Sequence, residues 1–132
     1  MPRIDRGLIR KWIKAVASAY GLKENGIGYI FCDDERILEV NRQFLGHDYY
    51  TDIITFDYSE PGNVSGELYI SLDTVMSNSV KFRTQYEREL LRVIIHGVLH
   101  LCGIQDKGPG QRAVMEAAED RALAMFDEMT EK

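Results

Sequence analysis

The chain has 132 residues, of which 45% are hydrophobic and 28% are charged, a balance that supports one compact domain with a buried core. Its net charge of −5 counts against tight non-specific binding of nucleic acid, although it leaves room for a local binding cleft. No apolar run is long enough for a membrane span or a signal peptide, so we expect a cytoplasmic protein without a membrane partner.

The first predicted element is an amphipathic helix over residues 5–20, which Gly21 ends. Its apolar residues recur at helical spacing, and they are Leu8, Ile9, Trp12, Ile13, Val16 and Ala17. The opposite side carries a basic stripe made of Arg3, Arg6, Arg10 and Lys14, with Lys11 beside them. Such a stripe can bind RNA phosphates, but it is also the ordinary solvated face of an amphipathic helix, which is the interpretation that we favour.

A strand is expected at residues 27–32, followed by a helix from Asp34 to about Leu45. Asp34 is the predicted N-cap of this helix, because its carboxylate can accept a hydrogen bond from an unpaired amide of the first turn. The predicted inner face of the helix consists of Ile37, Val40 and Phe44. The two cysteines, Cys32 and Cys102, lie in apolar segments and predict no disulfide, which fits a reducing compartment.

A loop at residues 46–50 leads into two predicted strands at 52–58 and 67–71, and a turn at Pro61 and Gly62 joins these strands as a hairpin. The tyrosines of the loop either stack on unpaired RNA bases or cover the edge of the core. The loop is therefore a candidate for substrate contact without a fixed role.

Three more helices are predicted, at residues 72–82, at 85–102 and from Pro109 onward. The helix at 85–102 begins with a capping box formed by Thr84 and Glu87 ahead of a long apolar run. The last helix carries an apolar side of Val114, Ala118, Ala122, Met125 and Met129. These elements predict an α+β fold, in which a small mixed β-sheet is packed by about five helices and the helix at 85–102 lies against the sheet.

The most informative segment is HGVLHLCGIQD, residues 96–106, because it places two histidines four residues apart on a helix. Side chains at this spacing lie on one face, so the rings of His96 and His100 can aim at one point. Gly103 can take the left-handed conformation that ends the helix, after which Asp106 can close a third side. Two histidines and one carboxylate, without an evident fourth ligand, predict a catalytic metal site with an open position.

Alternatives to this metal site follow from the neighbouring residues. Two histidines that hydrogen-bond to backbone carbonyls inside the core are the main alternative. Cys102 falls on the opposite face of the helix from His100, so we expect it to be a small buried apolar residue rather than a ligand. His47 lies in a loop and reaches the metal only if the tertiary structure brings it there.

The residues around the histidines also limit the chemistry. Gly97 stands where zinc peptidases of the HExxH type carry the glutamate that acts as general base, so a peptidase is a weaker hypothesis than another hydrolase. Non-haem iron oxygenases also use two histidines and a carboxylate, but on β-barrel strands, whereas both histidines here are on a helix. A metal-activated water is the only nucleophile that the sequence supports.

The chain resembles the bacterial YbeY metal-dependent endoribonucleases in three segments, which are TDIITF at 51–56, GELYIS at 66–71 and HGVLHLCG at 96–103. The resemblance covers most of the chain from about Gly28 onward and implies a single metal-dependent hydrolase domain over residues 1–132. It also implies a role in the maturation and quality control of small-subunit ribosomal RNA. The partners that it implies are this RNA, small-subunit ribosomal proteins and an assembly GTPase.

The chain departs from the usual family pattern, HGxLHLxGxDH, since Asp106 replaces the third histidine and Gln105 the aspartate before it. A carboxylate ligand lowers the net positive charge of the site by one, so the metal acidifies its bound water less. Lys107 can supply a positive charge near a phosphodiester. Leu45 occupies the place of an arginine thought to be catalytic in the family, so that role is not transferred. The family's short strand before the first helix is also missing, so the sheet has lost an edge strand or the chain is a shortened form.

We therefore expect a metal-dependent endoribonuclease specific for single strands, with one divalent ion per chain, for which zinc is the first choice. The predicted metal ligands are His96, His100 and Asp106. The cleft candidates, to which no acid or base role is assigned, are Asp52, Thr55 and Lys107. The alternatives are a hydrolase of another bond, such as a divergent peptidase, and a non-catalytic, metal-stabilised ribosome-assembly factor.

Overall fold

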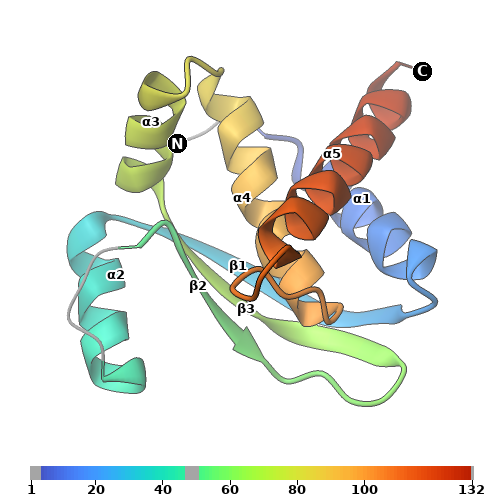
Figure 1. Cartoon of the computed structure of the whole chain (residues 1–132), viewed down its shortest axis with the longest axis horizontal. Coiled ribbons are helices and arrows are strands. Elements are labelled where there is room, and N and C mark those ends of the chain that lie inside the picture. The colour runs from blue at the N-terminus through green and yellow to red at the C-terminus, as the bar shows by residue number, and fades with distance from the viewer. Residues whose placement is uncertain (1–3, 47–50, 132) are drawn as a thin grey trace.

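The computed structural model describes residues 4–46 and 51–131, which form helices packed on a small sheet (Figure 1). In chain order the elements are α1 (Arg6–Ala19), β1 (Lys23–Cys32), α2 (Asp34–Val40), the π-helical turn η1 (Asn41–Leu45), β2 (Ile53–Asp57), β3 (Asn63–Ser71), α3 (Leu72–Lys81), α4 (Tyr86–Leu101) and α5 (Gln111–Thr130). The predicted fold class, α+β with about five helices, is confirmed. Within the described ranges, no helix has both the length and the apolar character needed to cross a bilayer.

The sheet is mixed, as predicted, and β3 is its central strand. β1 pairs with β3 in parallel and β2 pairs with β3 antiparallel, which gives the strand order β1-β3-β2. The predicted hairpin of β2 and β3 is confirmed, and its turn holds Gly62 at a φ of 81°, a conformation that is strained for other residues. β1 and β3 both begin earlier than predicted, because Lys23 pairs with Asn63 ahead of the apolar segments that marked the strands.

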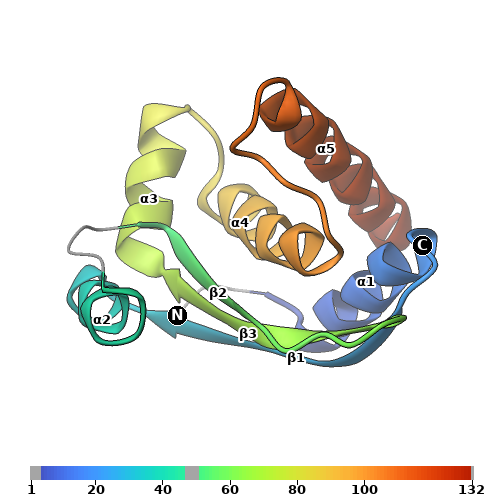
Figure 2. The ribbon, with the colours of Figure 1, turned by 60° about the horizontal axis from the view of Figure 1, so that its bottom comes forward.

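Helices cover both faces of the sheet (Figure 2). The main core lies between one face and the helices α1, α4 and α5, whereas a smaller core joins α2 to the other face. Trp12 of α1 is fully buried, and its Nε1–H donates a hydrogen bond of 2.7 Å to the carbonyl of Ala122 on α5. The ring of Trp12 also meets Phe126 edge to face. These contacts fix α5 against α1, and α5 in turn supplies part of the site described below.

The helix α4 lies directly on the sheet, as predicted. Gly97 is buried at the closest approach, where an added Cβ would lie 2.7 Å from Cδ1 of Ile53 and 2.8 Å from Cδ2 of Leu68. A glycine at this position lets the helix backbone approach both strands. Ile53 of β2 makes this contact, and Thr55, two residues along the strand, therefore points to the same face, on which α4 packs.

The predicted capping box of α4 is wrong. The N-cap is Gln85, and no side chain caps the amides of the first turn. Thr84 instead belongs to the end of α3, where its backbone N–H donates to the carbonyl of Ser79 at 2.9 Å. Thr84 lies between two helices, and it takes part in the C-terminal turn of α3 rather than in the N-cap of α4.

The predicted N-cap of α2 is displaced by one residue. Asp33 occupies this position, and its carboxylate accepts a 2.8 Å hydrogen bond from the N–H of Arg36. The carboxylate of Asp34 instead accepts hydrogen bonds from the hydroxyls of Ser71 and Thr74, at 2.5 and 2.6 Å. Asp34 therefore links the beginnings of α2 and α3, a tertiary contact that a local capping pattern does not reveal.

Two predicted helix faces also need correction. Phe44 is 59% exposed, since it lies in the π-helical turn η1 and its ring touches the smaller core only edge to face, at Phe56. The last helix begins after Gly110, whose φ is 76°, and not at Pro109. Its buried side contains Met115, and Val114 is exposed instead.

Candidate metal centre

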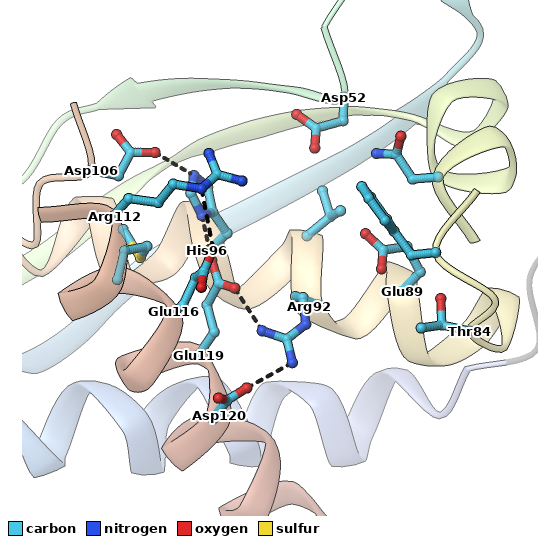
Figure 3. A pocket seen from close by; sticks show the side chains of 14 residues that line it. Asp52, Thr84, Glu89, Arg92, His96, Asp106, Arg112, Glu116, Glu119 and Asp120 are labelled. Atoms are coloured by element: carbon cyan, nitrogen blue, oxygen red, sulfur yellow. Dashed lines mark hydrogen bonds and ion pairs between the residues drawn. The ribbon is translucent and has the colours of Figure 1, made fainter. Parts of the chain in front are cut away.

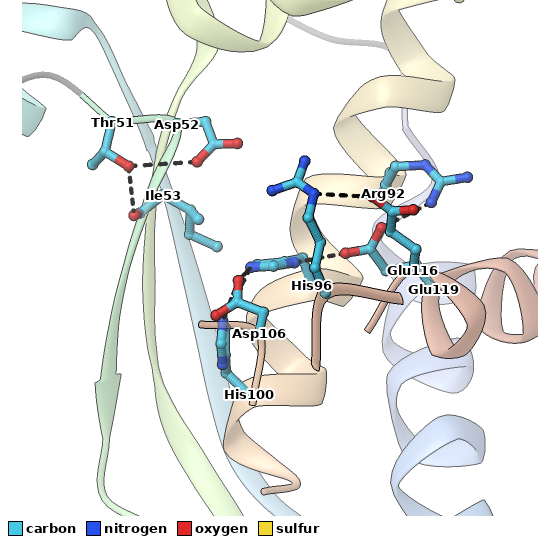
Figure 4. Close-up of polar contacts among 10 residues, drawn as sticks. Thr51, Asp52, Ile53, Arg92, His96, His100, Asp106, Glu116 and Glu119 are labelled. Atoms are coloured by element: carbon cyan, nitrogen blue, oxygen red, sulfur yellow. Dashed lines mark hydrogen bonds and ion pairs between the residues drawn. The ribbon is translucent and has the colours of Figure 1, made fainter. Parts of the chain in front are cut away.

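The three side chains that the sequence marks as metal ligands converge in the structure (Figure 4). Nε2 of His96 lies 3.0 Å from Nε2 of His100. Oδ2 of Asp106 lies 3.3 Å from the first of these nitrogens and 3.5 Å from the second. A tetrahedral zinc ion with bonds of about 2.0–2.1 Å separates neighbouring ligand atoms by about 3.3 Å. The three atoms thus have the spacing of one face of such a site.

The local fold explains this convergence. His96 and His100 are one helical turn apart on α4 and share a face of the helix. The helix then closes at Gly103, which has a φ of 100°, with backbone hydrogen bonds from Gly103 to His100 and from Ile104 to Leu99. This reversal, which the sequence predicts, carries Asp106 back to the histidines.

The hydrogen bonding of His96 prepares its other ring nitrogen for a metal. Oε2 of Glu119, on α5, lies 2.6 Å from Nδ1 of His96. An ionised carboxylate accepts from Nδ1–H, so this contact fixes the tautomer whose Nε2 lone pair faces His100 and Asp106. Electron-rich atoms at 3.0–3.5 Å repel one another unless a proton or a metal cation lies among them. The donor set of two imidazoles and one carboxylate therefore fits a divalent ion, zinc included.

Glu119 is a site residue that the sequence analysis missed. It is almost fully buried, and Arg92 bridges it to Asp120, since Nη1 of Arg92 donates to Glu119 and Nη2 to Asp120, both at 2.8 Å. Arg92 and His96 lie one turn apart on α4 and both meet Glu119. In the sequence, Glu119 is one of several acidic residues on the last helix, and only the packing of α5 against α4 distinguishes it.

The charges of the cluster shift its pKa values in opposite directions. Burial lowers the pKa of His96, but the hydrogen bond and the charge of Glu119 outweigh it, so that the pKa is raised. Burial and the neighbouring His96 lower the pKa of His100, which favours its neutral, metal-binding form. The pKa of Glu119 is lowered despite burial, because His96 and Arg92 both donate to its carboxylate. Glu119 is consequently an anion at neutral pH.

A cavity of about 630 Å³ opens beside the metal ligands (Figure 3). His96 and Asp106 lie on its wall, together with residues of α3, α4 and α5. Most of its charged residues are acidic, namely Asp52, Glu89, Asp106, Glu116, Glu119 and Asp120, against the two arginines Arg92 and Arg112. An anionic substrate can enter such a cavity only where a metal ion or an arginine offsets these carboxylates.

Asp52 is the one predicted cleft candidate that lines the cavity. Burial raises its pKa, against the opposing charge of His96 and hydrogen bonds from its surroundings. Burial likewise raises the pKa of Glu89, whose carboxylate faces the same cavity (Figure 3). Two carboxyl groups with raised pKa values thus line the cavity, and both are candidates for holding a proton.

The other candidates lie differently. Thr55 and Lys107 are not among the residues that line the cavity, and Lys107 is exposed. Cys102 is partly buried against the core and is absent from the ligand cluster, while burial raises the pKa of its thiol to about 11. His47 and the loop tyrosines lie outside the described residues. Leu45, at the end of η1, is exposed.

Comparison with known proteins gives one consistent result. A family model described as endoribonuclease YbeY matches residues 3–127. A protein of Parabacteroides distasonis described as endoribonuclease YbeY is 62% identical over 128 residues, which are 97% of this chain and 90% of the relative. A protein of Bacteroides fragilis with the same description is 64% identical over 125 residues, covering 95% of this chain and 90% of the relative.

One solved structure extends the comparison to the fold. The solution structure of TM1509 from Thermotoga maritima superposes with a TM-score of 0.66 at 26% sequence identity. The alignment covers 96% of this chain and 89% of that chain. The arrangement of helices and strands described above is therefore shared beyond the close relatives.

Proposed function

The chain belongs to the YbeY family of endoribonucleases, and we propose that it is a metal-dependent endoribonuclease that hydrolyses single-stranded RNA. The observation that carries the proposal is the triangle of ligand atoms from His96, His100 and Asp106, with sides of 3.0–3.5 Å. Two of its corners, His96 and Asp106, lie on the wall of the cavity. We further propose that the whole chain is one hydrolase domain, that zinc is the resident ion and that the enzyme works in the cytoplasm.

We assign separate roles to the metal ligands, to Glu119 and to Asp52. His96, His100 and Asp106 would hold the ion, and Glu119 would keep the ring of His96 oriented. When bound, the ion supplies an activated water and a Lewis acid for a phosphoryl oxygen. Asp52, a buried carboxyl group on the same cavity, would orient this water or hold its proton.

Arg112 is the basic residue that we assign to the phosphate. It lines the cavity near Asp106, and its Nε donates to Glu116 at 3.2 Å while the side chain stays exposed (Figure 3). A guanidinium can bind two phosphate oxygens at once, so Arg112 can offset the carboxylates around it. The sequence analysis sought this charge in Lys107, which lies off the cavity wall.

The biological substrate that we propose is small-subunit ribosomal RNA, in its maturation and quality control. Small-subunit ribosomal proteins and an assembly GTPase are the corresponding partners. The support for this finer statement is membership of the family, together with a cavity large enough for part of a single strand.

A peptidase is the weaker alternative for a structural reason. The HExxH glutamate would stand at position 97, and a Cβ there would collide with Ile53 and Leu68 of the sheet. The general base of such an enzyme would therefore point into the core. A non-catalytic assembly factor remains as the second alternative, and it needs the metal only for stability.

The test is cleavage of a labelled single-stranded RNA by the purified protein. We expect cleavage that a chelator abolishes and zinc restores, and that His100→Ala abolishes under all conditions. The matched control is Lys107→Ala, which alters an exposed side chain beside the ligand Asp106 and should cleave like the wild type. Turnover of a peptide without RNA cleavage would favour the peptidase. Metal binding without cleavage of either substrate would favour the assembly factor.

A further inference from the structure

A phenylalanine is exposed at the end of the cavity that the metal ligands do not occupy. Phe82 is 57% exposed, yet it lines the cavity together with Asn78, Thr84 and Glu89. Figure 3 shows Thr84 and Glu89 at the end opposite Asp106 and Arg112. An aromatic ring that stays open to solvent on the wall of a polar cavity is available to a planar ligand.

The backbone presents this ring through a strained turn. α3 closes with two hydrogen bonds, from Arg83 to Val80 and from Thr84 to Ser79, which is a closure that usually has glycine at the first donor position. Here Arg83 has a φ of 56°, and among the described residues it is the one non-glycine residue with a positive φ. Strained backbone conformations of this kind cluster at functional sites, so we consider the side chain of Arg83 a candidate for ligand binding.

The same turn carries two positive charges, on Lys81 and Arg83, which flank the lining residues Phe82 and Thr84. Lys81 places its Nζ 5.6 Å from the centroid of the Phe82 ring. Lys81 and Arg83 are exposed, and neither has an ion-pair partner in the described part of the chain. Glu89 is the carboxylate at this end of the cavity, and the other five acidic residues lie farther along the wall.

We propose that the turn at residues 81–84, together with Asn78, is a nucleotide subsite of the cavity. Phe82 stacks on one unpaired base, and Lys81 and Arg83 bind the phosphate beside that base. Asn78 offers its amide to the edge of the base. This inference rests on the proposed function, since it takes RNA as the substrate, and it places a second anchor of the strand away from the metal ligands.

Stacking and charge together explain why the subsite would select single strands. A base inside a duplex has no free face, whereas an unpaired base can stack on an aromatic ring whatever its sequence. Aromatic residues in such sites contribute about a tenfold change in affinity or more for each base. The amide of Asn78 can add a preference for one base, because it offers both a donor and an acceptor.

The first test measures equilibrium binding of a labelled 2′-O-methyl single strand by fluorescence anisotropy, with gel analysis to verify that the strand stays intact. Phe82→Leu keeps an apolar side chain but removes the ring, and we expect it to weaken binding about tenfold. Phe82→Tyr should restore wild-type affinity. Phe44→Leu is the matched control, because Phe44 is equally exposed at 59% but lies off the cavity, and it should bind like the wild type. Equal affinity of Phe82→Leu and the wild type would overturn the subsite.

A second measurement distinguishes stacking from a general loss of structure. Abasic positions are introduced one at a time along the strand. One of them should weaken binding to the wild type about tenfold and leave binding to Phe82→Leu unchanged, since the partner of that base is already gone. If every abasic position weakens binding to both proteins alike, Phe82 does not contact a base.

Arg83→Gly separates the stability of the turn from its function. Glycine relieves the positive φ, so the melting temperature should rise. Binding should nevertheless weaken, and its dependence on salt should fall by about one phosphate contact. A variant that is more stable and binds RNA as well as the wild type would show that Arg83 does not contact the strand.

These measurements test the subsite and the proposed function separately. Binding of an intact strand tests the subsite whether or not the protein cleaves RNA. Cleavage that His100→Ala abolishes, combined with unchanged binding by Phe82→Leu, would overturn the subsite alone. Binding that depends on Phe82 without any cleavage would overturn the proposed function alone, and an absence of RNA binding would overturn both.

Discussion

Glu119 shows how much of the site depends on a residue that no short motif contains. Its carboxylate holds Nδ1 of His96 at 2.6 Å and is itself held by Arg92 at 2.8 Å. Partners of this kind orient metal-binding histidines and raise their affinity for the ion. In the metal-free protein the same contact is a buried, charge-assisted pair, because Glu119 is an anion and the pKa of His96 is raised.

Replacing Glu119 with glutamine should therefore affect both metal binding and stability. We expect metal affinity to fall about 10- to 100-fold, measured by competition with a coloured chelator. We also expect the metal-free variant to lose about 1–3 kcal/mol of stability near pH 5.5, as measured by denaturant unfolding, because the pair is largely buried.

The pH dependence of this loss has a defined sign. The raised pKa of His96 gives a contribution that is complete below the ordinary value of 6.5 and is lost as the pH rises through the shifted value. The lowered pKa of Glu119 gives one that is complete above 4.5 and is lost as the pH falls. The difference between wild type and Glu119→Gln should thus be largest between these values. Glu116→Gln, on the exposed side of α5, is the control, and a loss that does not vary with pH would contradict the pairing.

The metal ligands were predictable from the sequence because they are local. His96 and His100 belong to one helical face, and Gly103 with Asp106 lies within the next two turns of chain. Glu119 was not predictable, since its selection among the acidic residues of α5 depends on how two helices pack. Arg112 escaped prediction for the same reason.

At the scale of elements, the contact of α4 with the sheet fixes where the ligands stand. Gly97 follows directly after His96, and the sheet side chains Ile53 and Leu68 pack against it. Any side chain at this position must push the helix away from the strands or displace both neighbours. The spacing of the helix from the sheet thus governs the position of the first ligand.

Gly97→Ala tests this contact. We expect a loss of about 1–3 kcal/mol from overpacking, of which the better helix propensity of alanine offsets at most about 1 kcal/mol. Metal affinity should fall as well, since His96 moves with the helix. The control is Gly28→Ala, whose added Cβ meets nothing within 4 Å and should change stability by less than about 0.5 kcal/mol. A fully stable Gly97→Ala with wild-type metal affinity would show that the helix has room to spare.

Element types and their order were predicted well because apolar periodicity reports on burial along one segment. Element ends were predicted less well, as Thr84 and Asp34 illustrate. Each has a side chain suited to capping the following helix, but Thr84 closes α3 and Asp34 accepts hydrogen bonds from Ser71 and Thr74. A capping motif identifies what a residue can do, and the tertiary structure decides which neighbour uses it.

At the scale of the whole molecule, basic residues separate into those on the cavity and those away from it. Arg92 and Arg112 line the cavity, and Lys81 and Arg83 flank its lining residues Phe82 and Thr84. Arg3 of the basic stripe lies outside the described residues. The other members, Arg6, Arg10, Lys11 and Lys14, are exposed and do not line the cavity, and Arg6 packs over the rings of Tyr29 and Phe31. This arrangement supports the interpretation of the stripe as a solvated face.

We accordingly expect Arg10→Ala combined with Lys14→Ala to leave RNA affinity and its salt dependence unchanged. For a single strand, the logarithm of the binding constant falls by about 0.7 for each phosphate contact when the salt concentration rises tenfold. The loss of one contact is therefore measurable. The readout is the slope of affinity against salt between about 50 and 200 mM. A shallower slope for this double variant would assign the stripe to RNA binding.

The central claim is that His96, His100 and Asp106 hold one divalent ion on which RNA cleavage depends. Its most direct test is the metal content of wild type, Asp106→Ala and Lys107→Ala, purified alike and assayed for cleavage in the same samples. We predict about one ion per chain in the wild type and in Lys107→Ala, with equal cleavage, and loss of both ion and cleavage in Asp106→Ala. Full metal content and full cleavage in Asp106→Ala would contradict the account.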